Sequence, residues 1–212
     1  MKKKILYLLF GYIFVLLFSA VSCIGNCGRG GPVPDMAKIS SIELRLSDAT
    51  YWYDSLPKRW EFNPIKNGTV LYKNYAINVI PHENTFFSKN YNSFSIINKS
   101  FACSPSELPH TDEILQNIKI TCNKDFDGMH PAGSDLNQLF DIFVLDDWDY
   151  KFEKKSNISD YLLSKPKFRK LILILNSPPA YSIDYEFKVE FFVDGIDKDY
   201  YELSTEKIII SN

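Results

Sequence analysis

Alternation of hydrophobic and polar residues predicts β-strands along most of the chain. In the segment 38–47 (KISSIELRLS), every second residue from Ile42 to Leu46 is aliphatic and the residues between them are polar. A period of two with one polar side is typical of a half-buried strand. Further segments with strand composition are 70–81, 93–103, 118–122, 142–145 and 185–193, and the last of these is followed by a predicted hairpin with return strands at 200–204 and 207–210.

Other segments depart from this alternation. The run 170–175 (KLILIL) has no polar side, which predicts a central strand buried on both faces or a strand in the core of a sandwich. Ser134 or Asp135 can cap a short helix that reaches Phe140, and the segment 157–163 predicts a second brief helix before Pro166. Short strands with one or two short helices predict a mostly β protein, an antiparallel sandwich of immunoglobulin-like kind.

The first 22 residues have the pattern of a signal peptide. Lys2, Lys3 and Lys4 precede an uncharged run at 5–18, and small residues follow before Cys23. The uncharged run has about 14 residues, fewer than the roughly 20 that span a bilayer. The sequence Ala-Val-Ser-Cys at 20–23 resembles a bacterial lipobox, which implies lipidation of Cys23 at the mature N-terminus. An ordinary secreted protein and a signal anchor are the alternatives.

The predicted organisation has three parts. Residues 1–22 form the signal peptide, residues 23–37 a lipidated tether and residues 38–212 a single β-rich domain. The tether contains a glycine- and proline-rich stretch (GNCGRGGPVP) that has too few apolar side chains to pack. The lipid on Cys23 then attaches the domain to a membrane. We expect the outer membrane, with the periplasmic or surface-facing side left open.

Net charge argues against nucleic acid as a partner. Removal of residues 1–22 removes three of the 24 Lys and Arg side chains and leaves 21 basic and 26 acidic ones, a formal charge of −5. Binding of phosphates requires a basic face. The charge of the mature chain therefore makes nucleic acid an unsuitable partner.

Three cysteines remain besides Cys23. An oxidising envelope permits a disulfide, and the predicted pair is Cys103 with Cys122, at the ends of two strand-like segments. The alternative is two buried free thiols that pack as small apolar side chains. The sequence leaves the state of Cys27 open.

Residues 118–140 carry a motif that resembles a known family. Asp125-Phe126-Asp127 is followed by His-Pro-Ala-Gly at 130–133 and by Leu-Asn-x-x-Phe at 136–140. This combination is similar to a family of Bacteroidota lipoproteins that carry a domain of unknown function. The resemblance implies an envelope lipoprotein with no established activity.

The same segment holds the candidate metal ligands. Asp125, Asp127 and Asp135 lie near glycines, as carboxylates do in calcium loops, and His130 offers a further ligand. The third ligand and the bidentate Glu of an EF-hand are missing, so a loop held by hydrogen bonds between side chains and backbone is the favoured interpretation. The three histidines lack the spacing of a zinc site. We expect no cofactor, with calcium as the one alternative.

No catalytic signature of the serine, cysteine or zinc hydrolases occurs in the chain. Trp52, Trp60 and Trp148 lie in aromatic stretches that can stack on sugar rings or anchor a protein, although aromatic residues in β-rich domains more often fill the core. The sequence thus predicts a non-enzymatic, envelope-anchored lipoprotein that binds a protein or a glycan. The alternative is a structural or accessory subunit of an envelope assembly, and a hydrolase is less favoured.

Overall fold

The described part of the chain is mostly β, with antiparallel sheets and one short α-helix. The computed structural model describes residues 36–52, 59–65, 68–87, 109–145, 152–155 and 157–212. Two compact units divide the chain, one made of Met1–Asp35 and Phe86–Pro109, the other of Met36–Thr85 and His110–Asn212. The elements below belong to the second unit, apart from Phe86 at the end of β4.

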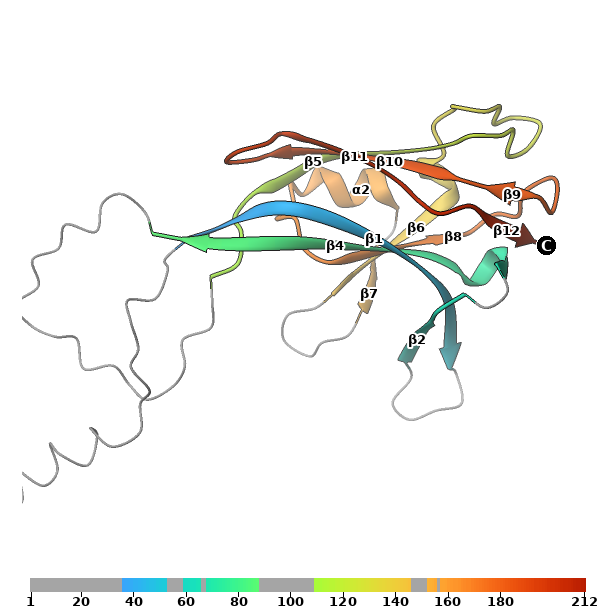
Figure 1. Cartoon of the computed structure of the whole chain (residues 1–212), viewed down its shortest axis with the longest axis horizontal. Helices are drawn as coiled ribbons and strands as arrows, with labels where there is room; N and C mark the ends of the chain where they lie inside the picture. Colours follow the sequence, from blue (N-terminus) through green and yellow to red (C-terminus); the bar gives the residue numbers. More distant parts are fainter. Residues whose placement is uncertain (1–35, 53–58, 66–67, 88–108, 146–151, 156) are drawn as a thin grey trace, which may run out of the picture. The chain divides into compact units, whose positions relative to one another are not determined.

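The larger sheet has six strands and curls strongly into a half-barrel (Figure 1). Strands β4 and β8, β8 and β6, β6 and β7, and β1 and β2 pair antiparallel. In spatial order the strands are β2 (Arg59–Asn63), β1 (Met36–Trp52), β4 (Tyr75–Phe86), β8 (Leu171–Leu175), β6 (Phe140–Leu145) and β7 (Phe152–Lys155).

Two smaller sheets face it. One has the order β11 (Tyr200–Ser204), β10 (Phe187–Asp194) and β5 (Ile114–Cys122), and lies above the half-barrel in Figure 1. The other has the order β3 (Thr69–Leu71), β12 (Ile208–Ser211) and β9 (Asp184–Tyr185). The helix α2 (Ile158–Leu163) and the 3-10 turns η1 (Tyr72–Asn74) and η2 (Asn137–Leu139) complete the described elements.

One hydrophobic core fills the space between the half-barrel and the facing sheets. Tyr75 and Leu173 come from the half-barrel, whereas Ile120 and Phe187 come from β5 and β10, and none of them is exposed. The ring of Phe187 lies 5.3 Å from that of Tyr75 and meets Phe140 edge-on at 5.7 Å, measured between ring centroids. Burial of this much apolar surface is the main favourable contribution to folding.

Strand β8 is buried on both faces, as its sequence predicts for a central strand. Leu171, Leu173 and Leu175 belong to the main core. Ile172 and Ile174 point to the other face of the half-barrel, where they form a second cluster with Ala49, Ala76 and Phe143. Strand β8 lies between β4 and β6, and side chains pack on both of its faces. Neither face meets solvent, so polar residues do not alternate with apolar ones in its sequence.

The prediction for 157–163 is confirmed, because Asn157 caps α2 by accepting a hydrogen bond from the backbone of Asp160 at 2.8 Å. The helix predicted up to Phe140 is only the turn η2, since the backbone before it bonds to β5. The hairpin prediction holds for β10 and β11, but β12 leaves them and pairs in parallel with β3.

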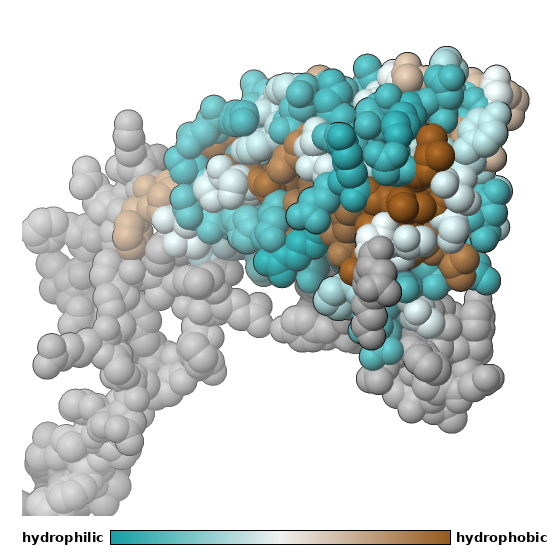
Figure 2. All heavy atoms as spheres, turned by 45° about the vertical axis from the view of Figure 1, so that its right-hand side comes forward, coloured by the Kyte–Doolittle hydropathy of each residue, from teal (hydrophilic) through white to brown (hydrophobic). Residues whose placement is uncertain are grey.

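The immunoglobulin-like sandwich is not evident, because the larger sheet is a half-barrel. Leu71 of β3 and Ile209 of β12 have exposed apolar side chains. Figure 2 shows hydrophobic residues exposed among hydrophilic ones on one face of the molecule. Within the described residues, no helix is long and apolar enough to cross a membrane.

Candidate functional site

The solvent side of the β11-β10-β5 sheet presents a regular array of side chains, which we call the outer face. Successive side chains of a strand point to opposite sides, so the residues between buried Val189, Phe191 and Ile120 point outward. The strand register places them in three rows, which are Thr121, Lys188 and Ser204, then Lys119, Glu190 and Glu202, then Asn117, Phe192 and Tyr200.

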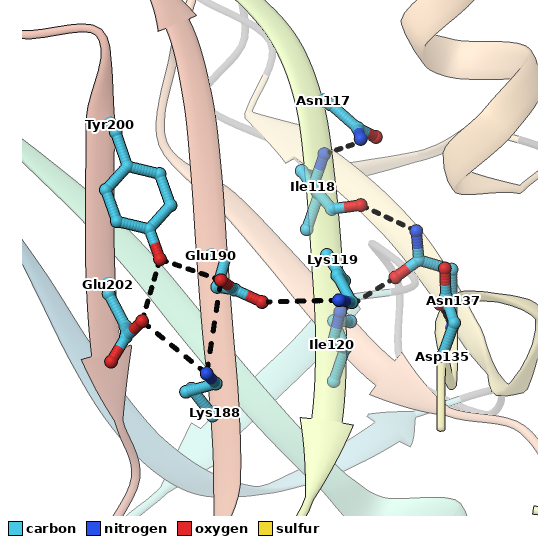
Figure 3. A network of polar contacts seen from close by, with 10 residues as sticks. All are labelled: Asn117, Ile118, Lys119, Ile120, Asp135, Asn137, Lys188, Glu190, Tyr200 and Glu202. Atoms are coloured by element: carbon cyan, nitrogen blue, oxygen red, sulfur yellow. Dashed lines mark hydrogen bonds and ion pairs between the residues drawn. The ribbon is translucent and has the colours of Figure 1, made fainter. Parts of the chain in front are cut away.

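A polar network links the middle of the outer face (Figure 3). The hydroxyl of Tyr200 lies 2.7 Å from a carboxylate oxygen of Glu190 and 2.7 Å from one of Glu202. The ammonium group of Lys188 lies 3.5 Å from Glu202 and 4.0 Å from Glu190, and that of Lys119 lies 3.9 Å from Glu190. Two lysines and two glutamates therefore balance in charge on this face.

The network shifts the pKa of Glu202 and of Tyr200. The hydrogen bond from Tyr200 and the nearby charge of Lys188 hold the pKa of Glu202 below its usual value. The carboxylates of Glu190 and Glu202 in turn raise the pKa of Tyr200. At neutral pH the face therefore carries an ionised Glu202 beside a neutral tyrosine hydroxyl.

An open groove of about 500 Å³ runs along the first row of the outer face. Strands β5 and β10 contribute Thr121, Lys119, Lys188 and Glu190, and the segment 132–133 borders it from the loop after β5. Gly133 has a φ of 80°, a left-handed conformation that glycine adopts without strain, so the loop can turn at the border of the groove.

Thr121 is the notable polar group in the groove. It is only 6% exposed, and its hydroxyl has no hydrogen-bond partner in the described part of the chain. Within the described residues, the fully enclosed polar atoms that lack a partner belong to Asp48, Tyr75 and Ser134. The hydroxyl oxygen of Thr121 is not one of these atoms. The free side of the hydroxyl is therefore reached from the groove.

The edge of β5 beside the groove is closed by a side chain. Asn137 accepts a hydrogen bond from the backbone of Ile120 at 3.0 Å and donates one to the carbonyl of Ile118 at 2.6 Å (Figure 3). The amide thus takes the place of a neighbouring strand, which leaves these edge groups satisfied.

The predicted calcium-loop residues are used to hold the loop. Asp127 accepts from the backbone of Met129 at 2.7 Å, Asp125 from that of Ala132 at 2.8 Å, and Asp135 from that of Asn137 at 2.8 Å. This is the hydrogen-bonded loop that the sequence favours over a metal site. Across the described ranges, no group of three or more His, Cys, Asp or Glu side chains is placed to hold a metal ion.

His130 is buried between two partners. Its Nδ1 lies 2.8 Å from Asp127 and its Nε2 lies 2.6 Å from the side-chain amide of Gln138. The bond from His130 is the main reason that the pKa of Asp127 is lowered. Both ring nitrogens are occupied, so this histidine fixes the loop and leaves no nitrogen for a substrate.

The family-like motif is therefore structural in this chain. Phe126, Leu136 and Phe140 are fully buried in the main core, and the polar positions of the motif hold the loop and the β5 edge.

The structure shows no disulfide at Cys122. Cys122 is a buried free thiol whose sulfur donates to the carbonyl of Lys124, and burial raises the pKa of this thiol. It behaves as a small core side chain, the alternative that the sequence left open. Its predicted partner Cys103, the lipidation site Cys23 and Cys27 lie outside the described residues.

The aromatic candidates of the sequence are not tested. Trp52 and Trp60 belong to β1 and β2, but their side chains and Trp148 lie outside the described part. The aromatic residues that the structure does place on the outer face are Phe192 and Tyr200, which the sequence did not single out. The available signal was Phe192 itself, an apolar residue at a position of β10 where the alternation calls for a polar one.

Comparison with known proteins identifies no relative of this chain. No family model matches the chain, and no curated protein or solved structure matches it significantly.

Proposed function

We propose that this protein is an envelope-anchored lipoprotein whose β-rich domain binds a glycan or a protein and catalyses no reaction. The lipobox-like sequence at Cys23 supports the anchor, and the resemblance of residues 118–140 to envelope lipoproteins agrees with it. The observation that carries the binding role is the groove beside the outer face, where hydrogen-bonding groups on a rigid sheet face solvent.

The chemistry of the outer face favours binding over hydrolysis. Glycosidases also use two nearby carboxyl groups, but one of them needs a raised pKa to act as a general acid. The lowered pKa of Glu202 makes this residue unsuited to the role of that acid. The one buried histidine of the adjoining loop has both nitrogens engaged.

A second candidate is an accessory subunit of an envelope assembly, which the free edge of β11 favours. The backbone of Val193 donates to the carbonyl of Asp199, and that of Thr205 donates to the carbonyl of Phe187. Bonded and outward-pointing positions alternate along an antiparallel strand, so Tyr200, Glu202 and Ser204 direct their backbone groups away from β10. No partner for these groups is found among the described residues. A protein partner can add a strand at such an edge.

Co-purification tests the binding role. The full-length protein is extracted from envelopes in mild detergent as wild type, as Ser204→Trp, which places an indole in the groove, and as Ser182→Trp, a matched control at an exposed serine away from it. We expect a bound glycan or protein with wild type and Ser182→Trp and its loss with Ser204→Trp. Equal yields from all three proteins contradict the proposal.

The anchor has its own test. Cys23→Ser should leave an unprocessed precursor that no longer partitions into detergent.

The co-purification experiment also tests the second candidate. A stoichiometric protein that co-purifies with both tryptophan variants favours the accessory subunit.

A further inference from the structure

The groove is balanced in charge. Lys119 and Lys188 line it together with Glu186 and Glu190. The ion pairs on Glu190 are long, 3.9 Å to Lys119 and 4.0 Å to Lys188, so the ammonium groups keep hydrogens free for another acceptor. Neither an anion nor a cation gains net attraction from such a lining, whereas a hydroxyl group can both donate and accept there.

Thr121 adds a buried group that lacks a partner. Thr121 is nine-tenths buried as a residue, but its hydroxyl opens to the groove without a protein partner, so a ligand there can form a directional hydrogen bond with it. Asn123 lies beside it in the groove, and its side-chain oxygen already accepts from the backbone of Glu186 at 3.0 Å. The amide hydrogens of Asn123 have no protein acceptor in the described part of the chain and are left for a ligand.

An aromatic pair ends the outer face. The rings of Phe192 and Tyr200 lie 5.2 Å apart between centroids, and each residue is 36% exposed. This row lies four residues along β10 from the row of Lys188, which is about 14 Å in an extended strand. The rings are tilted by 53° to each other, so each offers its own apolar face beside hydrogen-bonding groups.

We infer that the groove and the outer face together bind a neutral oligosaccharide, with one sugar in the groove against Thr121 and another on the Phe192 and Tyr200 rings. This inference rests on the proposed function and names its ligand class. The separation of the two ends requires more than one sugar ring. An extended peptide is the other class of ligand, and it would instead pair with the edge of β11 and leave Thr121 unused.

The test uses full-length protein in mild detergent on an array of neutral oligosaccharides, their sialylated and sulfated counterparts, and extended peptides. The Kd of the best ligand is then measured for wild type and three variants. Thr121→Val removes the free hydroxyl and should weaken binding about tenfold. Phe192→Ala should weaken it about fivefold. Tyr181→Ala, at an exposed aromatic residue that belongs to neither the outer face nor the groove lining, should leave it unchanged.

Binding of neutral oligosaccharides that falls in the first two variants and not in the third supports the inference. It is overturned when no neutral oligosaccharide binds, when the charged counterparts or the peptides bind better, or when Thr121→Val binds as wild type. If Ser204→Trp still loses a co-purifying ligand in those cases, only the ligand class fails and the groove remains a binding site. If Ser204→Trp changes nothing either, both proposals fail.

Discussion

Glu190 and Glu202 lie directly opposite each other on β10 and β11, and each has a carboxylate oxygen 2.7 Å from the hydroxyl of Tyr200. Like charges directly opposite in a sheet are destabilising. The tyrosine has one hydrogen to donate, so it bonds one carboxylate at a time while Lys188 lies near both. Tyr200 and Lys188 therefore offset the repulsion between Glu190 and Glu202.

Tyr200→Phe should lower the stability of the domain at neutral pH. The variant loses the bond that mainly depresses the pKa of Glu202. A depressed carboxyl pKa stabilises the fold above the unfolded value of about 4.3, and this contribution is lost as the pH falls through the folded pKa. Urea unfolding from pH 3 to pH 8 should therefore show two stability curves that converge at the acid end.

Tyr181→Phe is the control for this titration, because Tyr181 is exposed and lies outside the outer face. Its curve should coincide with that of wild type throughout. A difference between Tyr200→Phe and wild type that stays constant down to pH 3 would show that the hydroxyl acts without Glu202.

Glu113 is a buried carboxylate that joins three segments. It accepts from the backbone of Ile39 in β1 at 2.6 Å, from the backbone of Ile196 after β10 at 2.7 Å and from the hydroxyl of Thr111 at 3.1 Å. Glu113→Gln keeps the shape but turns an amide N–H₂ toward one of these donors. We expect a loss of about 1–3 kcal/mol in the free energy of unfolding, and a larger loss for Glu113→Ala.

Chemical denaturation measures this loss. Glu206→Gln is the matched control at an exposed glutamate and should stay within about 0.5 kcal/mol of wild type. Equal stability of Glu113→Gln and wild type would mean that the bonds to Glu113 contribute nothing net.

The sequence predicts the strands wherever one face meets the core and the other meets water. The alternation in β10 and the apolar run of β8 both follow from where their side chains lie, so each is visible locally. The sequence does not reveal the parallel pairing of β12 with β3 or the curl of the larger sheet, because both involve segments that are far apart in the chain. No local pattern encodes which distant strand becomes a neighbour.

The candidate site is hidden from the sequence for the same reason. Lys119, Glu190 and Glu202 share a row only because of the register between three strands. The missing partner of Thr121 is a property of its surroundings in the fold. The sequence does favour hydrogen bonding by the aspartates of the loop after β5, since short acidic side chains near glycines bond to nearby backbone groups.

Asn137→Ala should uncover the edge of β5. The variant leaves the backbone N–H of Ile120 and the carbonyl of Ile118 without the side chain that now bonds them. We expect the free energy of unfolding to fall by about 1–3 kcal/mol and hydrogen exchange at the backbone amide of Ile120 to become faster. The amide of Lys119, which points toward β10, serves as the internal control. Unchanged exchange at Ile120 would mean that Asn137 does not protect this edge.

Thr121 and Thr205 provide a matched pair for separating binding from folding, because each is 6% exposed and each can be changed to valine. The hydroxyl of Thr205 accepts from the backbone of Phe187 at 3.0 Å, whereas that of Thr121 has no partner in the described residues. Thr205→Val should therefore lower the free energy of unfolding by about 1–2 kcal/mol. Thr121→Val should leave the free energy of unfolding within about 0.5 kcal/mol of wild type or raise it slightly, since the variant removes an unpaired polar group. Urea denaturation of the two variants beside wild type measures both values. A larger loss in Thr121→Val than in Thr205→Val would show that the Thr121 hydroxyl is bonded within the fold and is not held free for a ligand.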